Sequence, residues 1–207
     1  MKTIRSRFKA LAALALLSFP LAAAQAASFY YTALLDGPSE SPPNASPGTG
    51  FAEVIYDDSL HTLQLDITFS GLLGTTTASH IHAPTSSSGT GTAGVATTTP
   101  YFAGFPLGVT SGAYLSTLDL TLASSFSSGY LAANGGTPAG AEATLAAALA
   151  SDKAYLNIHT SVFQGGEIRG FLVAVPEPSS LALLGLGALV FARSPRFKAR
   201  VASGGAR

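Results

Sequence analysis

The feature that most restricts the fold of this chain is an alternation of apolar and polar residues. Between positions 63 and 69 the apolar residues are Leu63, Leu65, Ile67 and Phe69, and the intervening residues are Gln64, Asp66 and Thr68. Successive side chains of a β-strand point to opposite faces, so this period of two predicts a strand with one buried face.

Similar runs occur along the middle of the chain, separated by turn-forming clusters rich in Gly, Pro, Asp and Ser. The further β-rich runs are 29–35, 50–57, 113–122, 153–160 and 167–174. One helix interrupts the series: Thr137 is an expected N-cap, Pro138 fits the first helical position, and an Ala/Leu-rich stretch runs to Ala150. Many short strands with Gly- and Pro-rich turns predict an all-β domain, an antiparallel β-sandwich or Greek-key fold, with one short helix before the last hairpin.

The first 27 residues have the pattern of a secretory signal peptide. Four cations (Lys2, Arg5, Arg7 and Lys9) precede an apolar run that ends in small residues, Ala24-Gln25-Ala26-Ala27. The sequence therefore predicts an exported protein whose mature domain begins near Ser28.

The C-terminal end contains a second apolar run bounded by distinctive residues. Val175-Pro176-Glu177-Pro178 leads into an apolar run, and a basic cluster of Arg193, Arg196, Lys198 and Arg200 follows it. About 14 residues rise only about 21 Å as a helix, which is short for a hydrocarbon core of about 30 Å. The trailing cations favour a cytoplasmic end, so we expect a short hydrophobic helix that anchors the chain in the membrane.

This C-terminal segment, residues 175–200, resembles the PEP-CTERM sorting signal of Gram-negative bacteria that produce exopolysaccharide. Residues 201–207 are a short tail beyond that pattern. The resemblance implies an exosortase-type processing enzyme as a partner and a transient anchor in the inner membrane. Release to the cell surface or the extracellular matrix would follow, where exopolysaccharide or envelope proteins are candidate partners.

The expected domain, residues 28–174, is acidic and lacks cysteine. It holds ten Asp and Glu but only Lys153 and Arg169 as cations, which gives a net charge of about −8. Nucleic acid needs a basic surface, so nucleic acid is excluded as a partner. The absence of cysteine excludes disulfides and thiolate chemistry.

Two strand-like segments carry the residues best suited to a site. Ser79-His80-Ile81-His82 places His80 and His82 on one face, and Tyr155 to Thr160 places Asn157 and His159 on one face. After the turn that follows, Glu167 and Arg169 share a face of the next segment.

These segments resemble the CHRD domain, a module named after chordin. The resemblance rests on Glu40-Ser41-Pro42-Pro43, Ala78 to Pro84, Tyr155 to Thr160 and Gly166 to Gly170, and extends over residues 28–174. It implies an all-β domain without an established activity. Two positions depart from the usual pattern: Ala83 replaces a Gly, and Phe163-Gln164 stands where a Pro-containing pair is common.

The histidines admit two interpretations. In one, His80, His82 and His159 supply three nitrogens to zinc or copper, and the chain is a metal-binding protein or a metal-dependent enzyme. In the other, these side chains, with Asn157, Glu167 and Arg169, hold loops to strands, and Glu167 pairs with Arg169. No catalytic residue or cofactor is expected under the second interpretation, and the chain is then an exported binding or structural module.

Overall fold

The computed structural model describes residues 28–176, in which eight strands form one antiparallel sheet. The strands are β1 (Ser28–Asp36), β2 (Thr49–Asp57), β3 (Thr62–Ser70), β4 (Thr76–His82), β5 (Gly112–Asp119), β6 (Tyr155–Thr160), β7 (Ile168–Phe171) and β8 (Val173–Ala174). Their order is β4-β6-β7-β1-β2-β3-β5, and β8 pairs with β1.

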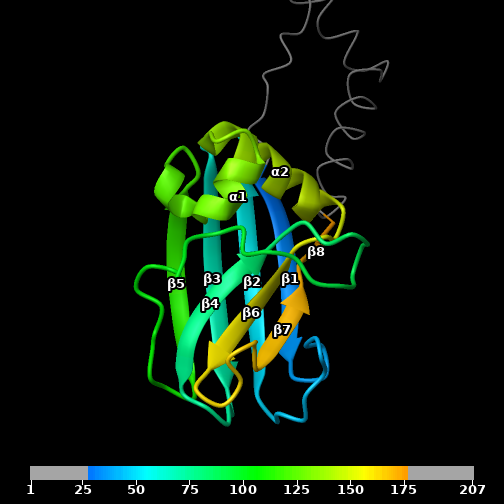
Figure 1. Cartoon of the computed structure of the whole chain (residues 1–207), viewed down its shortest axis with the longest axis vertical. Coiled ribbons are helices and arrows are strands. Elements are labelled where there is room, and N and C mark those ends of the chain that lie inside the picture. The colour runs from blue at the N-terminus through cyan, green and yellow to red at the C-terminus, as the bar shows by residue number, and fades with distance from the viewer. Residues whose placement is uncertain (1–27, 177–207) are drawn as a thin grey trace, which may run out of the picture.

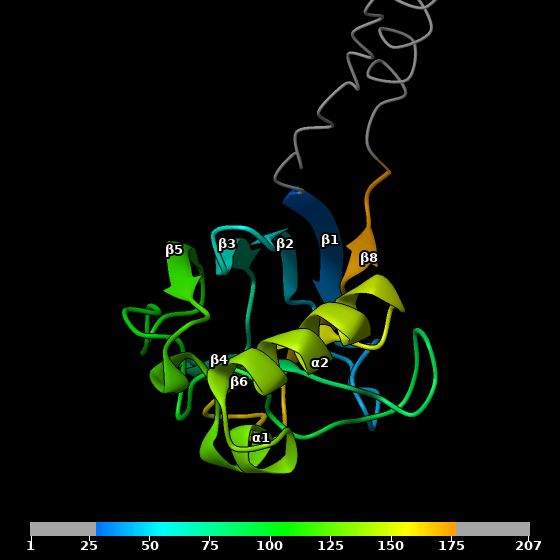
Figure 2. The same ribbon diagram turned by 90° about the horizontal axis from the view of Figure 1, so that it is seen from above.

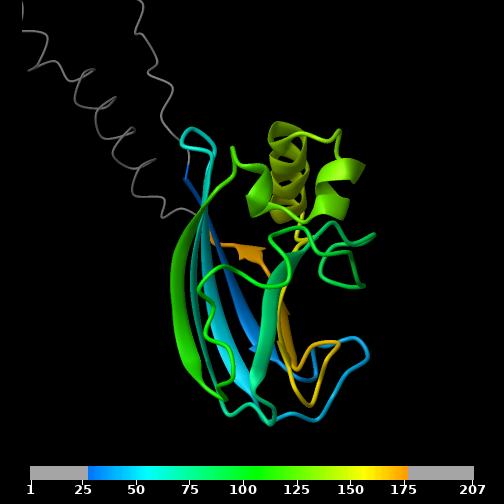
Figure 3. The same ribbon diagram turned by 60° about the vertical axis from the view of Figure 1, so that its left-hand side comes forward.

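The sheet curls until it forms two facing layers. β1, β2, β3 and β5 make one layer, and β4, β6 and β7 make the other (Figures 1 and 3). The apolar positions of the alternation are those that fill the space between the layers: Leu63, Leu65 and Ile67 from β3 have no exposed surface, and neither have Ile81 and Ile158 from the facing layer. The expected antiparallel sandwich is confirmed.

Helical segments close one end of the sandwich. They are η1 (Ala123–Ser125), α1 (Ser128–Ala133) and α2 (Pro138–Ala150), and α2 lies across the end between the two layers (Figure 2). The side chain of Thr137 accepts a hydrogen bond from Gly140 N, as expected of an N-cap, and Pro138 opens the helix. The sequence pattern predicts α2 correctly but does not predict α1, which is only six residues long.

Two of the predicted strand runs differ from the observed strands by more than two residues or by a break. The run 113–122 leaves the sheet after Asp119, and the run 167–174 is divided at Leu172. Leu172 is fully buried and its N–H donates to Ala154 O, so the backbone turns inward there. As a result β7 pairs with β6 and with the end of β1 at Asp36, whereas β8 pairs with β1 at Tyr31 and Thr32.

The chain leaves the sandwich beside the start of β1, where Val175 N donates to Tyr30 O at 2.8 Å. Within residues 28–176 no helix has the length and apolar character needed to span a bilayer. The expected signal peptide (1–27), Glu177 and Pro178 of the sorting signal, the C-terminal hydrophobic helix and the tail (201–207) all lie outside the described residues.

Candidate metal centre

The register of β4 and β6 brings three histidines to one face. His80 lies opposite Asn157, His82 opposite Tyr155, and Ala78 opposite His159. Directly opposed residues of an antiparallel pair point to the same side, so the three imidazoles and the Asn157 amide share a face. Ile81, Leu156 and Ile158 occupy the other face, which is packed into the core.

Each imidazole is held by a backbone carbonyl from a loop that covers this face. His80 Nε2 lies 2.6 Å from Pro100 O, His82 Nδ1 lies 2.9 Å from Ala93 O, and His159 Nδ1 lies 2.8 Å from Gln164 O. A carbonyl oxygen can only accept, so the proton of each neutral ring is on the nitrogen that faces the carbonyl. The lone pairs are therefore on His80 Nδ1, His82 Nε2 and His159 Nε2.

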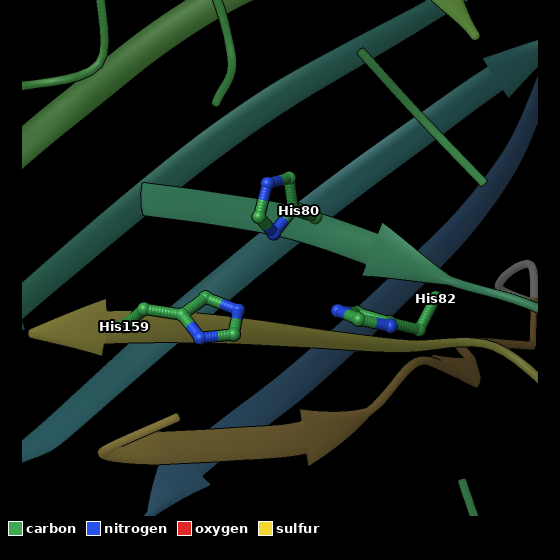
Figure 4. Close-up of side chains that lie close together, drawn as sticks. All are labelled: His80, His82 and His159. Atoms are coloured by element: carbon green, nitrogen blue, oxygen red, sulfur yellow. The ribbon is translucent and has the colours of Figure 1, made fainter. Parts of the chain in front are cut away.

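The three rings converge (Figure 4). One ligand nitrogen from each lies within 4.8 Å of those of the other two. Ring centroids are 5.2 Å apart for His80 and His159, and 5.7 Å apart for His80 and His82. His80 Nδ1 and His159 Nε2 are buried without a hydrogen-bond partner, and His82 Nε2 lies 3.1 Å from Asn157 Oδ1.

Burial keeps these histidines neutral. It lowers the pKa of His80 to about 4 and also lowers the pKa of His82 and of His159, and the loop carbonyls only partly oppose the effect. Neutral imidazole is the form that binds a metal ion, and a backbone carbonyl on the second ring nitrogen is the usual way to orient such a ligand.

The donor set fits a borderline transition metal. Imidazole nitrogen suits zinc and copper, and Zn–N bonds of about 2.0–2.1 Å in a tetrahedron hold the nitrogens roughly 3.3 Å apart. The two ligand nitrogens that lie farthest apart, at up to 4.8 Å, would have to approach each other by about 1.5 Å to bind one ion. Over residues 28–176 no carboxylate joins the three histidines.

The fourth histidine is not part of this cluster. His61 lies on the β2–β3 turn, where its Nδ1 is 3.0 Å from both carboxylate oxygens of Glu142 on α2. Its side chain is 51% exposed. This contact ties α2 to the sheet.

Glu167 and Arg169 do not form the ion pair that the sequence interpretation included. Glu167 is fully buried and accepts four hydrogen bonds, from Ser46 Oγ, Thr160 Oγ1, Leu73 N and Gly74 N. Burial opposes the ionisation of Glu167, but these four donors outweigh it and lower its pKa. Glu167 therefore joins β7 to the β3–β4 turn and to the loop after β1.

Arg169 instead supports the histidine face from behind Tyr155. The Tyr155 ring stacks on His82 with centroids 4.8 Å apart, and the Arg169 guanidinium carbon lies 4.8 Å from the Tyr155 centroid. Arg169 Nε donates to Ser39 O, and Nη1 donates to Gly91 O at 3.2 Å.

The carboxylate nearest to Arg169 is Glu40, for which the sequence patterns predict no role. Glu40 Oε2 lies 3.9 Å from Arg169 Nε, and burial raises the pKa of Glu40 to about 7 despite this cation. Glu40 stands in the Glu-Ser-Pro-Pro segment, so the only signal for it was its place in the CHRD pattern.

Comparison with known families agrees with this architecture. A family model described as CHRD domain matches residues 31–172, and one described as PEP-CTERM protein-sorting motif matches residues 174–196. No curated protein and no solved structure matches the chain.

An exported β-sandwich followed by a sorting signal is thus the class of protein that the fold and the two matches define. The chain belongs to the CHRD domain family, which covers most of its length. Its C-terminal motif makes it a substrate of an exosortase-type sorting system, with export and transient anchoring in the membrane.

Proposed function

We propose that the exported domain is a non-catalytic binding module that holds one transition-metal ion through His80, His82 and His159. The observation that carries this proposal is the convergence of three buried nitrogen lone pairs. In each ring the other nitrogen bears the proton and donates it to a loop carbonyl.

The free-energy cost of burying unpaired nitrogen atoms favours a bound ligand at this cluster. A buried polar atom without a partner costs about 1–3 kcal/mol, and two of the three lone pairs have no partner. The face opposite these histidines makes the apolar core, so they are not needed to fill it. Zinc or copper would satisfy all three nitrogens at once.

A role in binding is favoured over catalysis because the described residues place no carboxylate in the cluster. Glu40, the carboxylate closest to Arg169, is not among the groups that converge in the cluster. Hydrolysis that relies on a carboxylate as general base would need such a group beside the metal, and the described residues place none in the cluster.

The metal content of the processed protein, purified without a polyhistidine tag, tests the proposal. We expect about one zinc or copper per chain, lost in His80→Ala and in His159→Ala. His61→Ala is the matched control, since His61 lies outside the cluster, and it should keep the metal.

A thermal measurement provides an independent readout. Metal bound only by the folded state stabilises it by about 2.7 kcal/mol at a hundredfold excess over Kd, so a chelator should lower Tm in the wild type and in His61→Ala but not in His80→Ala. A folded wild type that binds neither zinc nor copper would contradict the proposal.

The site of action follows from the sorting motif. We propose release from the inner membrane of a Gram-negative cell to the surface or the polysaccharide matrix, where the acidic domain contacts envelope proteins or exopolysaccharide. Pro176→Ala or Glu177→Ala should leave an unprocessed, membrane-bound form. Normal release of both variants would count against this route.

A further inference from the structure

Asn157 is the polar side chain that completes the histidine face. It is 2% exposed, lies on β6 between Tyr155 and His159, and has its Oδ1 at 3.1 Å from His82 Nε2. This contact differs from those between the histidines and the loop carbonyls, because neither atom carries a hydrogen.

The protonation of His82 follows from its other nitrogen. Nδ1 faces Ala93 O at 2.9 Å and must donate to it, so Nε2 of the neutral ring carries a lone pair. Asn157 Oδ1 is also only an acceptor. Two lone pairs therefore face each other at 3.1 Å.

The orientation of the Asn157 amide is supported from its other side. A side-chain carbon added to Gly166 would lie 3.0 Å from Asn157 Nδ2 and still closer to Glu40 Oε1, so both groups crowd around Gly166. Glu40 Oε1 is buried and lacks a donor. A carboxyl oxygen that lacks a donor favours the NH₂ end of the amide on its side, whereas a flipped amide would turn oxygen toward oxygen.

We propose that Asn157 Oδ1 is the fourth ligand of the ion bound by His80, His82 and His159, an inference that rests on the function proposed above. A cation bound between His82 Nε2 and Asn157 Oδ1 would accept both lone pairs as coordination bonds, and the repulsion between the two atoms would be removed. Ligands 3.1 Å apart, each about 2.1 Å from an ion, subtend an angle of roughly 95°.

The mixed donor set also specifies the class of ion. An amide oxygen is a harder donor than imidazole, so three nitrogens and one oxygen favour a divalent ion such as Zn²⁺ over the softer Cu⁺.

Titration of Zn²⁺ into the apo form of the processed protein at pH 8 tests this inference. Wild type is compared with Asn157→Leu, Asn157→Asp and His80→Ala. We expect Asn157→Leu to bind zinc at least 10–100 times more weakly, because the loss of even an outer-shell partner of a metal ligand typically costs that much. Asn157→Asp should bind at least as tightly as wild type.

The outcomes separate the two proposals. Wild type that binds no zinc overturns the metal site itself. Wild-type binding that is lost in His80→Ala but unchanged in a folded Asn157→Leu overturns only the role of Asn157. If Asn157→Leu does not fold, Asn157→Asp decides: zinc binding at least as tight as in wild type supports the inference, and a tenfold loss overturns it.

Discussion

Glu167→Gln changes the size of the side chain very little, yet the structure predicts a large loss of stability for it. The carboxylate is fully buried, and each of its oxygens accepts two hydrogen bonds: Oε1 from Ser46 Oγ and Leu73 N, and Oε2 from Gly74 N and Thr160 Oγ1. Glutamine keeps one acceptor oxygen but turns an NH₂ group toward two donors.

The expected magnitude follows from these contacts. Hydrogen bonds to a charged group contribute about 1.5–3 kcal/mol each, and breaking a buried charged network costs about 3–5 kcal/mol. We therefore expect the free energy of unfolding to fall by roughly 3–5 kcal/mol, or Tm by about 6–20 °C for a domain of this size.

Urea unfolding of the processed protein, followed by circular dichroism, measures this loss. The matched control is Glu53→Gln, because Glu53 is an exposed carboxylate on the outer face of β2, and it should change stability by less than about 0.5 kcal/mol. A loss below about 1 kcal/mol in Glu167→Gln would refute the reasoning.

The pH dependence provides a second check on Glu167. Its folded pKa is lowered, so its contribution is present above the unfolded pKa, near 4.5, and is lost as pH falls through the folded pKa. The difference between wild type and Glu167→Gln should accordingly be constant near neutrality and shrink in acid. A difference that does not change down to pH 2 would mean that the charge of Glu167 is not what stabilises this junction.

Two further predictions concern the titration of His61 and of Glu40. His61→Ala should lose more stability at pH 5.5 than at pH 9, because the hydrogen bond to Glu142 raises the pKa of His61. The stabilisation by the protonated imidazole is lost as pH rises through the folded pKa. Urea midpoints at the two pH values measure the difference, and equal losses would contradict it. Glu40→Gln should gain stability relative to wild type between pH 5 and pH 8, by roughly 1–3 kcal/mol, since burial raises the pKa of Glu40 to about 7 and the folded state resists ionisation in that window. A relative stability that does not vary with pH would show that Glu40 ionises as freely in the folded as in the unfolded chain.

The sequence predicted the parts of this protein that depend on local periodicity. Alternation alone assigned Leu63, Leu65 and Ile67 to the core, and it placed His80 with His82 and Asn157 with His159 on common faces. What it could not establish was that β4 and β6 are neighbours, because that pairing is non-local.

The features that the sequence did not predict depend on loop paths. The carbonyls of Ala93, Pro100 and Gln164 set the tautomers of the histidines, and any residue type can supply a carbonyl. The partner assigned to Glu167 was wrong for a related reason. A nearby cation was the simplest partner for a carboxylate, whereas the fold surrounds Glu167 with hydroxyl and amide donors.

The register of β4 against β6 also determines when the site can exist during folding. His82 and Asn157 are 75 residues apart in sequence, and the connection between them includes β5, α1 and α2. Contacts of such separation form late, because loop-closure entropy must be overcome first. A truncated or still-emerging chain that ends before β6 has only one of the two strands, so the histidine cluster exists only once β6 has paired with β4, and the proposed metal uptake would report that long-range step of folding.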